Sequence, residues 1–157
     1  MSTNIQEIKN LSIGFKSQKG EQISILRNIT TNVRKGETVG IVGESGSGKS
    51  TLALAMMGYI KQGLFTTGGE CFFKSLDLLK LNNKELVEIR GRKIAMIPQN
   101  AGQALTPNLK IGYQIEEALK LHTDFNKVER EQKISELLNQ VRLPSPKIMA
   151  LRYPHEL

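Results

Sequence analysis

Residues 40–51 read GIVGESGSGKST, and this glycine-rich segment limits the possible folds more than any other part of the sequence. The residues TVGIV at 38–42 are apolar and mostly β-branched, as expected for a strand that is buried on both faces. The residues STLALAMMGYI are apolar on almost every side and predict a buried helix from about Lys49 to Gly58. A strand, a glycine loop and a helix in this order predict the phosphate-binding part of an α/β fold.

The loop fits the pattern G-x-x-x-x-G-K-[ST], with glycine at 43 and 48. Glycine lets backbone N–H groups face a phosphate, and the start of a helix adds free donors and partial positive charge. Lys49 has the reach to contact the β- and γ-phosphates, and the Ser50 hydroxyl is a candidate magnesium ligand. The alternative is a Gly/Ser-rich turn with a solvated lysine, but the flanking strand and helix favour a nucleotide site. The expected nucleotide contacts are Gly43, Glu44, Ser45, Gly46, Ser47, Gly48, Lys49, Ser50 and Thr51.

Composition narrows the class of protein. The chain has 157 residues, of which 39% are apolar and 24% charged, a balance typical of a soluble globular domain. Cys71 is its single cysteine, so an internal disulfide is excluded and a reducing cytoplasm fits best. The net charge is +7, but the basic residues are scattered and only 5% of residues are aromatic. We therefore expect no direct nucleic-acid binding.

The remaining segments predict a β-rich start, an α/β core and a helical part from about residue 105. Period-2 alternation predicts half-buried strands at 11–15 and 23–33, joined by a hairpin loop within KSQKGEQ. The other expected elements are a short strand at 68–73, a helix within 82–91, a buried strand at 93–99, a loop at 99–108, amphipathic helices at 111–122 and 126–141, and a final helix in KIMALRYPHEL that Pro154 ends.

This order of segments resembles the ATP-binding subunit of ABC transporters over essentially the whole chain. RKGETVGIVGESGSGKST matches the approach to the family's Walker A loop, and IAMIPQ places Gln99 where the family has its Q-loop glutamine. GES, IRGRKIAMI and the final YPHEL look like the branch that imports peptides, dipeptides, nickel and metal–metallophore complexes. Pro98, Asn100 and QALTPN depart from that branch's pattern in a segment that faces the membrane subunit in the family, so the transported substrate stays open.

The resemblance implies a fold class: α/β, a P-loop nucleoside triphosphatase core with an N-terminal antiparallel β-subdomain and the start of a helical subdomain. Residues 1–104 would form the β-subdomain and part of the core, and residues 105–157 part of the helical subdomain. Leu157 would be the first residue of the signature motif, which makes the chain roughly the N-terminal half of a nucleotide-binding subunit. The Walker B carboxylates and the switch histidine would lie outside it, and His155 is not that histidine.

The resemblance also implies roles and partners. Phe15 would stack on adenine, or is simply the inward end of a strand. Gln99 would contact magnesium and the attacking water, or is a solvated amide at a strand end. Lys49 and Gln99 are the catalytic candidates, Ser50 and Gln99 the magnesium ligands, and ATP and Mg²⁺ the expected cofactors. The expected partners are a second ATP-binding subunit, transmembrane permease subunits and a solute-binding protein.

The expected function is ATP hydrolysis that powers import of peptides, nickel or metal complexes, from a peripheral position at the cytoplasmic side of the membrane. Two alternatives stay open. One is a module that binds ATP without hydrolysing it, which fits these 157 residues alone. The other is a soluble ABC ATPase that acts in translation or DNA repair rather than in transport.

Overall fold

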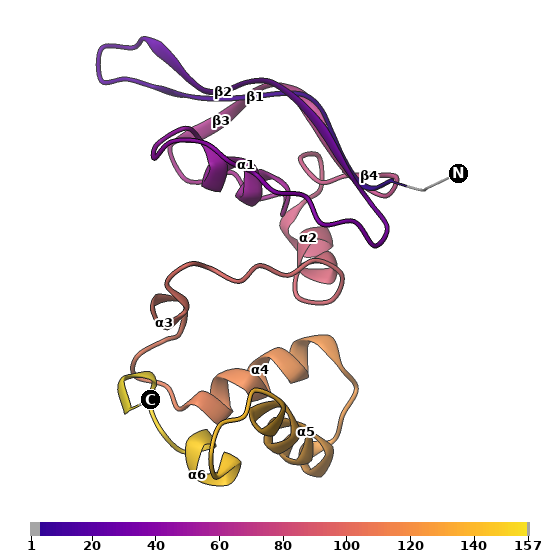
Figure 1. Cartoon of the computed structure of the whole chain (residues 1–157), viewed down its shortest axis with the longest axis vertical. Coiled ribbons are helices and arrows are strands. Elements are labelled where there is room, and N and C mark those ends of the chain that lie inside the picture. Colours follow the sequence, from indigo (N-terminus) through magenta and orange to yellow (C-terminus); the bar gives the residue numbers. More distant parts are fainter. Residues whose placement is uncertain (1–3, 157) are drawn as a thin grey trace. The chain divides into compact units, whose positions relative to one another are not determined.

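A computed structural model describes residues 4–156, apart from the side chains of residues 101 and 103. The chain divides into two compact units, Met1–Arg90 and Gly91–Leu157 (Figure 1), and each is described by itself. The subdomain boundary between 104 and 105 stays a prediction.

An antiparallel sheet forms the first unit. Its strands are β1 (Asn4–Lys16), β2 (Gln22–Arg34), β3 (Leu64–Phe73) and β4 (Leu76–Asp77), in the spatial order β2-β1-β3-β4. β1 and β2 form the long hairpin in Figure 1, and their connection is closed where Ser17 N–H donates to the carbonyl of Glu21 at 2.8 Å. This confirms the antiparallel β-rich start that period-2 alternation predicted.

The core of this sheet comes mainly from β1, whose alternation shifts between Ile8 and Leu11, where the pairing with β2 is irregular. Ile8, Leu11 and Ile13 of β1 are completely buried, and β1 lies between β2 and β3 in the sheet. Cys71 and Phe73 of β3 join them in the core. Burial of apolar side chains on one face of a sheet is the main force that fixes strand register.

Two short helices accompany the sheet. α1 spans Lys49–Ala55: it begins at the residue that the sequence predicted, but it ends before the predicted Gly58, because residues 56–58 form a turn. α2 spans Asn83–Ile89 and begins with a capping box, in which the Asn82 side chain accepts from Glu85 N–H at 3.1 Å and the Glu85 carboxylate accepts from Asn82 N–H at 2.8 Å. This box satisfies backbone donors that a helix start leaves free, and α2 confirms the helix predicted within residues 82–91.

The two strands predicted for a buried parallel core are wrong. Residues 38–42 form no strand, and the side chain of Val42 is 96% exposed. Residues 93–99 contain only an isolated bridge at Ile94, and Ile97 is 92% exposed. An apolar, β-branched run becomes a strand only when a neighbour takes up its backbone hydrogen bonds, and no strand of the described residues pairs with either run.

The second unit is helical. The two predicted amphipathic helices are confirmed as α4 (Ile111–His122) and α5 (Lys127–Gln140), and α5 begins with a capping box at Asn126. α6 (Pro146–Ala150) confirms the final helix, although Pro154 does not end it: Pro154 begins the 3-10 helix η1 (Pro154–Glu156). The sequence missed α3 (Ala101–Ala104), which lies in the predicted loop.

Ile111, Ile134 and Leu138 form the core of the helical unit, against which Met149 and Ala150 of α6 pack. None of the described helices combines the length and the apolar character that crossing a bilayer requires.

Candidate nucleotide-binding loop

The glycine loop turns sharply before it opens α1. Gly46 has φ +81° and Gly48 has φ +91°, both in the left-handed region that glycine adopts without steric cost. Ser47 N–H donates to the carbonyl of Glu44 at 3.2 Å, which closes the turn between these positions. The loop therefore needs glycine for its shape and not only for flexibility.

Gly48 also lies directly against the sheet. A Cβ at this position would stand 2.8 Å from Cδ2 of Leu26 and 3.3 Å from the carbonyl oxygen of Ile25, both on β2. Leu26 is only 4% exposed, so it has little room to move away. The last turn of the loop, and with it the start of α1, is therefore held against β2.

The Lys49 side chain folds back across the loop. Its ammonium donates to the carbonyl of Gly43 at 2.7 Å and to the carbonyl of Glu44 at 2.6 Å, and lies 3.5 Å from Oγ of Ser47. An ammonium has three donors and no acceptor. A full positive charge is thus held beside the turn that leads into the helix, where the backbone also exposes N–H groups.

Ser50 and Thr51 occupy the first turn of α1, and Ser50 is exposed. Magnesium keeps several waters in such sites and takes one or two protein oxygens together with substrate phosphates. None of the described His, Cys, Asp and Glu side chains gather in groups of three that would hold a metal ion by themselves. An exposed hydroxyl next to the loop therefore fits a magnesium ion that arrives with a phosphate ligand.

The remaining predicted site residues lie in different units. Phe15 belongs to the first unit together with the loop, pairs with Ile23 and Leu64 in the sheet and is partly buried. Gln99 belongs to the second unit, where it is exposed in a bend before α3. The two interpretations of Phe15 and of Gln99 both remain predictions.

Asp77 is the carboxylate of the first unit that is most strongly engaged in the fold. Its Oδ1 accepts from the backbone N–H groups of Cys71 and Leu79 at 3.3 and 3.2 Å, and its Oδ2 lies 2.9 Å from the Lys80 ammonium. The Asp77 side chain raises the pKa of Lys80. Burial raises the pKa of the nearby Cys71 thiol to about 11. These groups stabilise the β3–β4 turn, so Asp77 is not placed to activate a water molecule.

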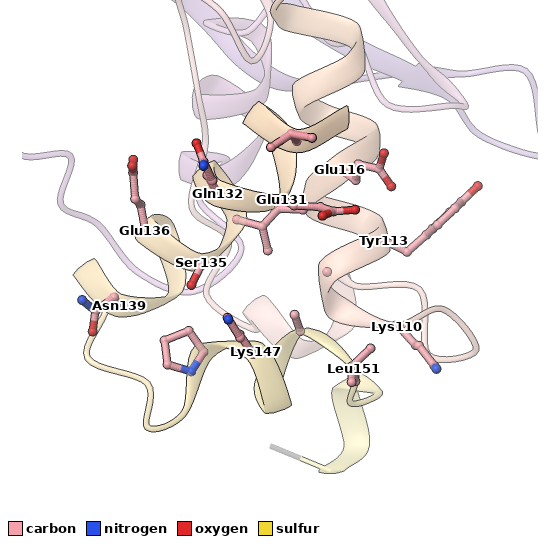
Figure 2. Close-up of a pocket in the computed structure, with 15 residues that line it drawn as sticks. Lys110, Tyr113, Glu116, Glu131, Gln132, Ser135, Glu136, Asn139, Lys147 and Leu151 are labelled. Atoms are coloured by element: carbon pink, nitrogen blue, oxygen red, sulfur yellow. The ribbon is translucent and has the colours of Figure 1, made fainter. Parts of the chain in front are cut away.

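Sequence patterns did not reveal a groove of about 970 Å³ between α4, α5 and α6 (Figure 2). In Figure 2, Glu131 extends from α5 toward α4, and Lys147 projects from α6. Glu116, which also lines the groove, forms ion pairs with Lys120 at 3.0 Å and Arg130 at 3.1 Å. Both partners lower the pKa of the Glu116 carboxyl. The groove depends on the packing of three helices, so no local signal in the sequence could have indicated it.

Comparison with known proteins shows the family of this chain. The family model described as ABC transporter matches residues 26–157, a stretch that includes the whole glycine loop. The chain belongs to the ABC transporter family. The resemblance noted from the Walker A approach, Gln99 and YPHEL is therefore confirmed.

Curated relatives match nearly the whole chain. The oligopeptide transport ATP-binding protein OppD of Bacillus subtilis (strain 168) is 40% identical over 98% of this chain and 43% of its own length. The dipeptide transport ATP-binding protein DppD of Lactococcus lactis subsp. cremoris is 37% identical over 97% of this chain and 44% of its own length. The glutathione import ATP-binding protein GsiA of Salmonella paratyphi A is 36% identical over 99% of this chain and 26% of its own length. The chain thus spans less than half the length of these relatives.

A solved structure supports the fold. The ATP-binding cassette MJ0796, as a dimer in a post-hydrolysis state bound to ADP and Pi, is 29% identical and superposes with a TM-score of 0.82 over 97% of this chain and 62% of that chain. A second dimeric structure of the same bacterial ABC transporter cassette gives a TM-score of 0.81. This confirms the expected α/β ABC ATPase fold, of which the chain forms a part.

Proposed function

We propose that this chain is the ATP-binding part of an ATPase subunit that powers the import of short peptides. The relatives described above carry names for oligopeptide, dipeptide and glutathione import, and glutathione is a tripeptide. Nickel and metal complexes remain the alternative cargo, because they were expected from the same branch of the family.

The position of Lys49 is the observation that carries the proposal. Its ammonium is held beside the loop by two carbonyl oxygens, at 2.7 and 2.6 Å. When ATP binds, the β- and γ-phosphate oxygens replace these carbonyls as acceptors, and the bonds shorten because both partners are charged. The loop amides contribute further donors, and the start of α1 adds partial positive charge.

Fewer residues are candidates for contacts with the magnesium ion and with the adenine base than with the phosphates. Ser50 and the side-chain oxygen of Gln99 would be the ligands of Mg²⁺ next to the phosphates. The ion, when bound, neutralises charge on the phosphates that Lys49 also contacts. Phe15 would stack on adenine, which needs only an exposed ring face.

For these 157 residues by themselves we propose ATP binding without turnover. Hydrolysis needs a carboxylate that polarises the attacking water, and the Asp77 carboxylate is already bound by two backbone donors and Lys80. In the complete protein the partners would be a second ATP-binding subunit, permease subunits and a solute-binding protein, at the cytoplasmic face of the membrane. A non-transport ABC ATPase is the alternative. Flanking genes for two permeases and a binding protein would favour transport.

Titration calorimetry of Lys49→Ala with a non-hydrolysable ATP analogue tests the nucleotide site. Loss of a charge-assisted contact to phosphate should raise the Kd about 10- to 100-fold. The control is the double variant Arg34→Ala/Lys35→Ala, which removes charge from the exposed end of β2 and the turn that follows it, and should leave the Kd unchanged. Equal affinities of the wild type and Lys49→Ala would contradict the proposal.

A further inference from the structure

Two side chains from distant elements hold the end of α1 that lies away from the glycine loop. Gln6 of β1 donates its Nε2–H to the carbonyl of Met56. Arg90, which follows α2, donates its Nε–H to the carbonyl of Met57 at 2.8 Å. Met56 and Met57 are the two residues directly after α1. Carbonyls at the end of a helix lack partners within the helix, so these donors satisfy groups that would otherwise need water.

Arg90 is also fixed by further contacts. Its guanidinium lies 5.8 Å from the centroid of the Tyr59 ring, within the range of a cation–π contact, and its backbone N–H donates to Leu86 at 2.8 Å. α2 packs against the same turn, where a Cβ on Gly58 would stand 2.8 Å from Cδ2 of Leu86. A positive charge beside the C-terminal end of a helix complements the helix dipole. Arg90 therefore ties the end of α1 to α2 by charge and by a hydrogen bond, and Leu86 of α2 adds packing against the same turn.

The short length of α1 connects these contacts to the loop. α1 has seven residues and begins at Lys49, so a tilt at its far end also moves the first turn with Ser50. At the near end, the atoms nearest to a Cβ on Gly48 belong to Leu26 and Ile25 of β2. The orientation of α1 is thus set by contacts at both ends, and the side chains of Gln6 and Arg90 supply those at its C-terminal end.

We propose that Arg90 and Gln6 are positioning residues that orient α1, and through it the phosphate-binding loop. This inference rests on the proposed ATP-binding function of the loop. Neither side chain belongs to the glycine loop, and both act through the carbonyls of Met56 and Met57. Sequence patterns did not single them out, because the contacts join residues 33 and 50 positions apart.

Binding of a non-hydrolysable ATP analogue to Arg90→Ala, Arg90→Lys and Arg34→Ala provides the first test. Arg90→Ala removes one hydrogen bond and should raise the Kd about 3- to 10-fold. Arg90→Lys keeps the charge and a donor and should restore part of the affinity. Arg34→Ala is the matched control, since Arg34 is an exposed arginine of the same unit, and should leave the Kd unchanged.

The second test reads the loop directly. The amide ¹H and ¹⁵N shifts of Gly46 and Gly48, measured without nucleotide, should change in Arg90→Ala and stay in place in Arg34→Ala. If Arg90 only stabilised the fold, Arg90→Ala would lower the melting temperature and leave these shifts and the Kd of the folded protein unchanged. That result would overturn the inference. Gln6→Ala tests the same coupling from β1 if Arg90→Ala does not fold.

The outcomes separate the two proposals. A wild-type chain that does not bind the analogue refutes the proposed function, while shifted glycine amides would still support the positioning role. A wild-type chain that binds, with Lys49→Ala weakened and Arg90→Ala unaffected in both tests, refutes the positioning role alone.

Discussion

Alanine variants of Gly46 and Gly48 separate two reasons for glycine in the phosphate-binding loop: the left-handed backbone and the close packing against β2. Gly46 and Gly48 share the left-handed backbone, with φ +81° and +91°, but only Gly48 has neighbours within 4 Å of its missing Cβ. A left-handed alanine costs about 1–2 kcal/mol. Gly46→Ala should therefore lower the free energy of unfolding of the first unit by about 1–2 kcal/mol.

Gly48→Ala adds a steric term to this backbone term. The new Cβ would meet Cδ2 of Leu26 at 2.8 Å and the carbonyl oxygen of Ile25 at 3.3 Å, and the buried Leu26 has little freedom to rotate away. Overpacking of this kind costs about 1–3 kcal/mol. We take the lower part of that range, because the closest atom is the end of a side chain, and expect a total loss of about 2–4 kcal/mol.

The assay is urea denaturation of both variants, followed by hydrogen exchange of the β1 and β2 amides, which reports on the first unit. The difference between Gly48→Ala and Gly46→Ala measures the packing of the loop against β2. Equal destabilisation would show that the contact with Leu26 carries no energy. The double variant Gly48→Ala/Leu26→Ala should lack the clash with Leu26, so its loss should exceed that of Leu26→Ala by less than Gly48→Ala alone costs.

Four further predictions concern caps, the thiol, turnover and exposed apolar runs. Asn82→Ala removes a capping box and should cost about 1 kcal/mol of unfolding free energy, seen as a lower urea midpoint, whereas the exposed Asn139→Ala should not. The pKa of Cys71 rises from 9.0 to about 11 in the folded chain, so the unfolded thiol ionises first and stability should fall between these pH values; Cys71→Ser should flatten this fall. Purified chain with ATP and magnesium should release no phosphate above the level of Lys49→Ala, and clear release that this variant abolishes would show that a residue within the chain supplies the missing base. Val42→Lys/Ile97→Lys should reduce light scattering of the purified chain more than the equally charged Val128→Lys/Val141→Lys, because only the first pair interrupts exposed apolar runs.

The sequence predicted best those elements whose signals are local. α2 and α5 begin at asparagine caps, with a glutamate three residues later, and α4 and α5 show the apolar spacing of helices. The loop followed from residues 43–50 alone, since glycine, lysine and serine occur in a fixed pattern directly before a helix. Each of these features is decided within a few neighbouring residues.

Elements that depend on distant partners were not predictable in this way. Residues 38–42 have the composition of a buried strand, yet a strand exists only where another strand pairs with it, and Val42 is 96% exposed. The contacts of Gln6 and Arg90 with α1 depend on how β1 and α2 fold against the helix. Composition and periodicity carry no information about such pairings.

Both ends of α1 are anchored, and this restricts how the proposed site responds to a phosphate. Gly48 lies against β2 at one end, and Arg90 bonds the carbonyl of Met57 at the other. Between these anchors, the Lys49 ammonium is held by the carbonyl oxygens of residues 43 and 44. Exchange of these two acceptors for phosphate oxygens needs rotation of one side chain and no movement of the helix. Because little of the binding free energy is then spent on ordering the backbone, a change that loosens either anchor should weaken phosphate binding even though it leaves Lys49 in place.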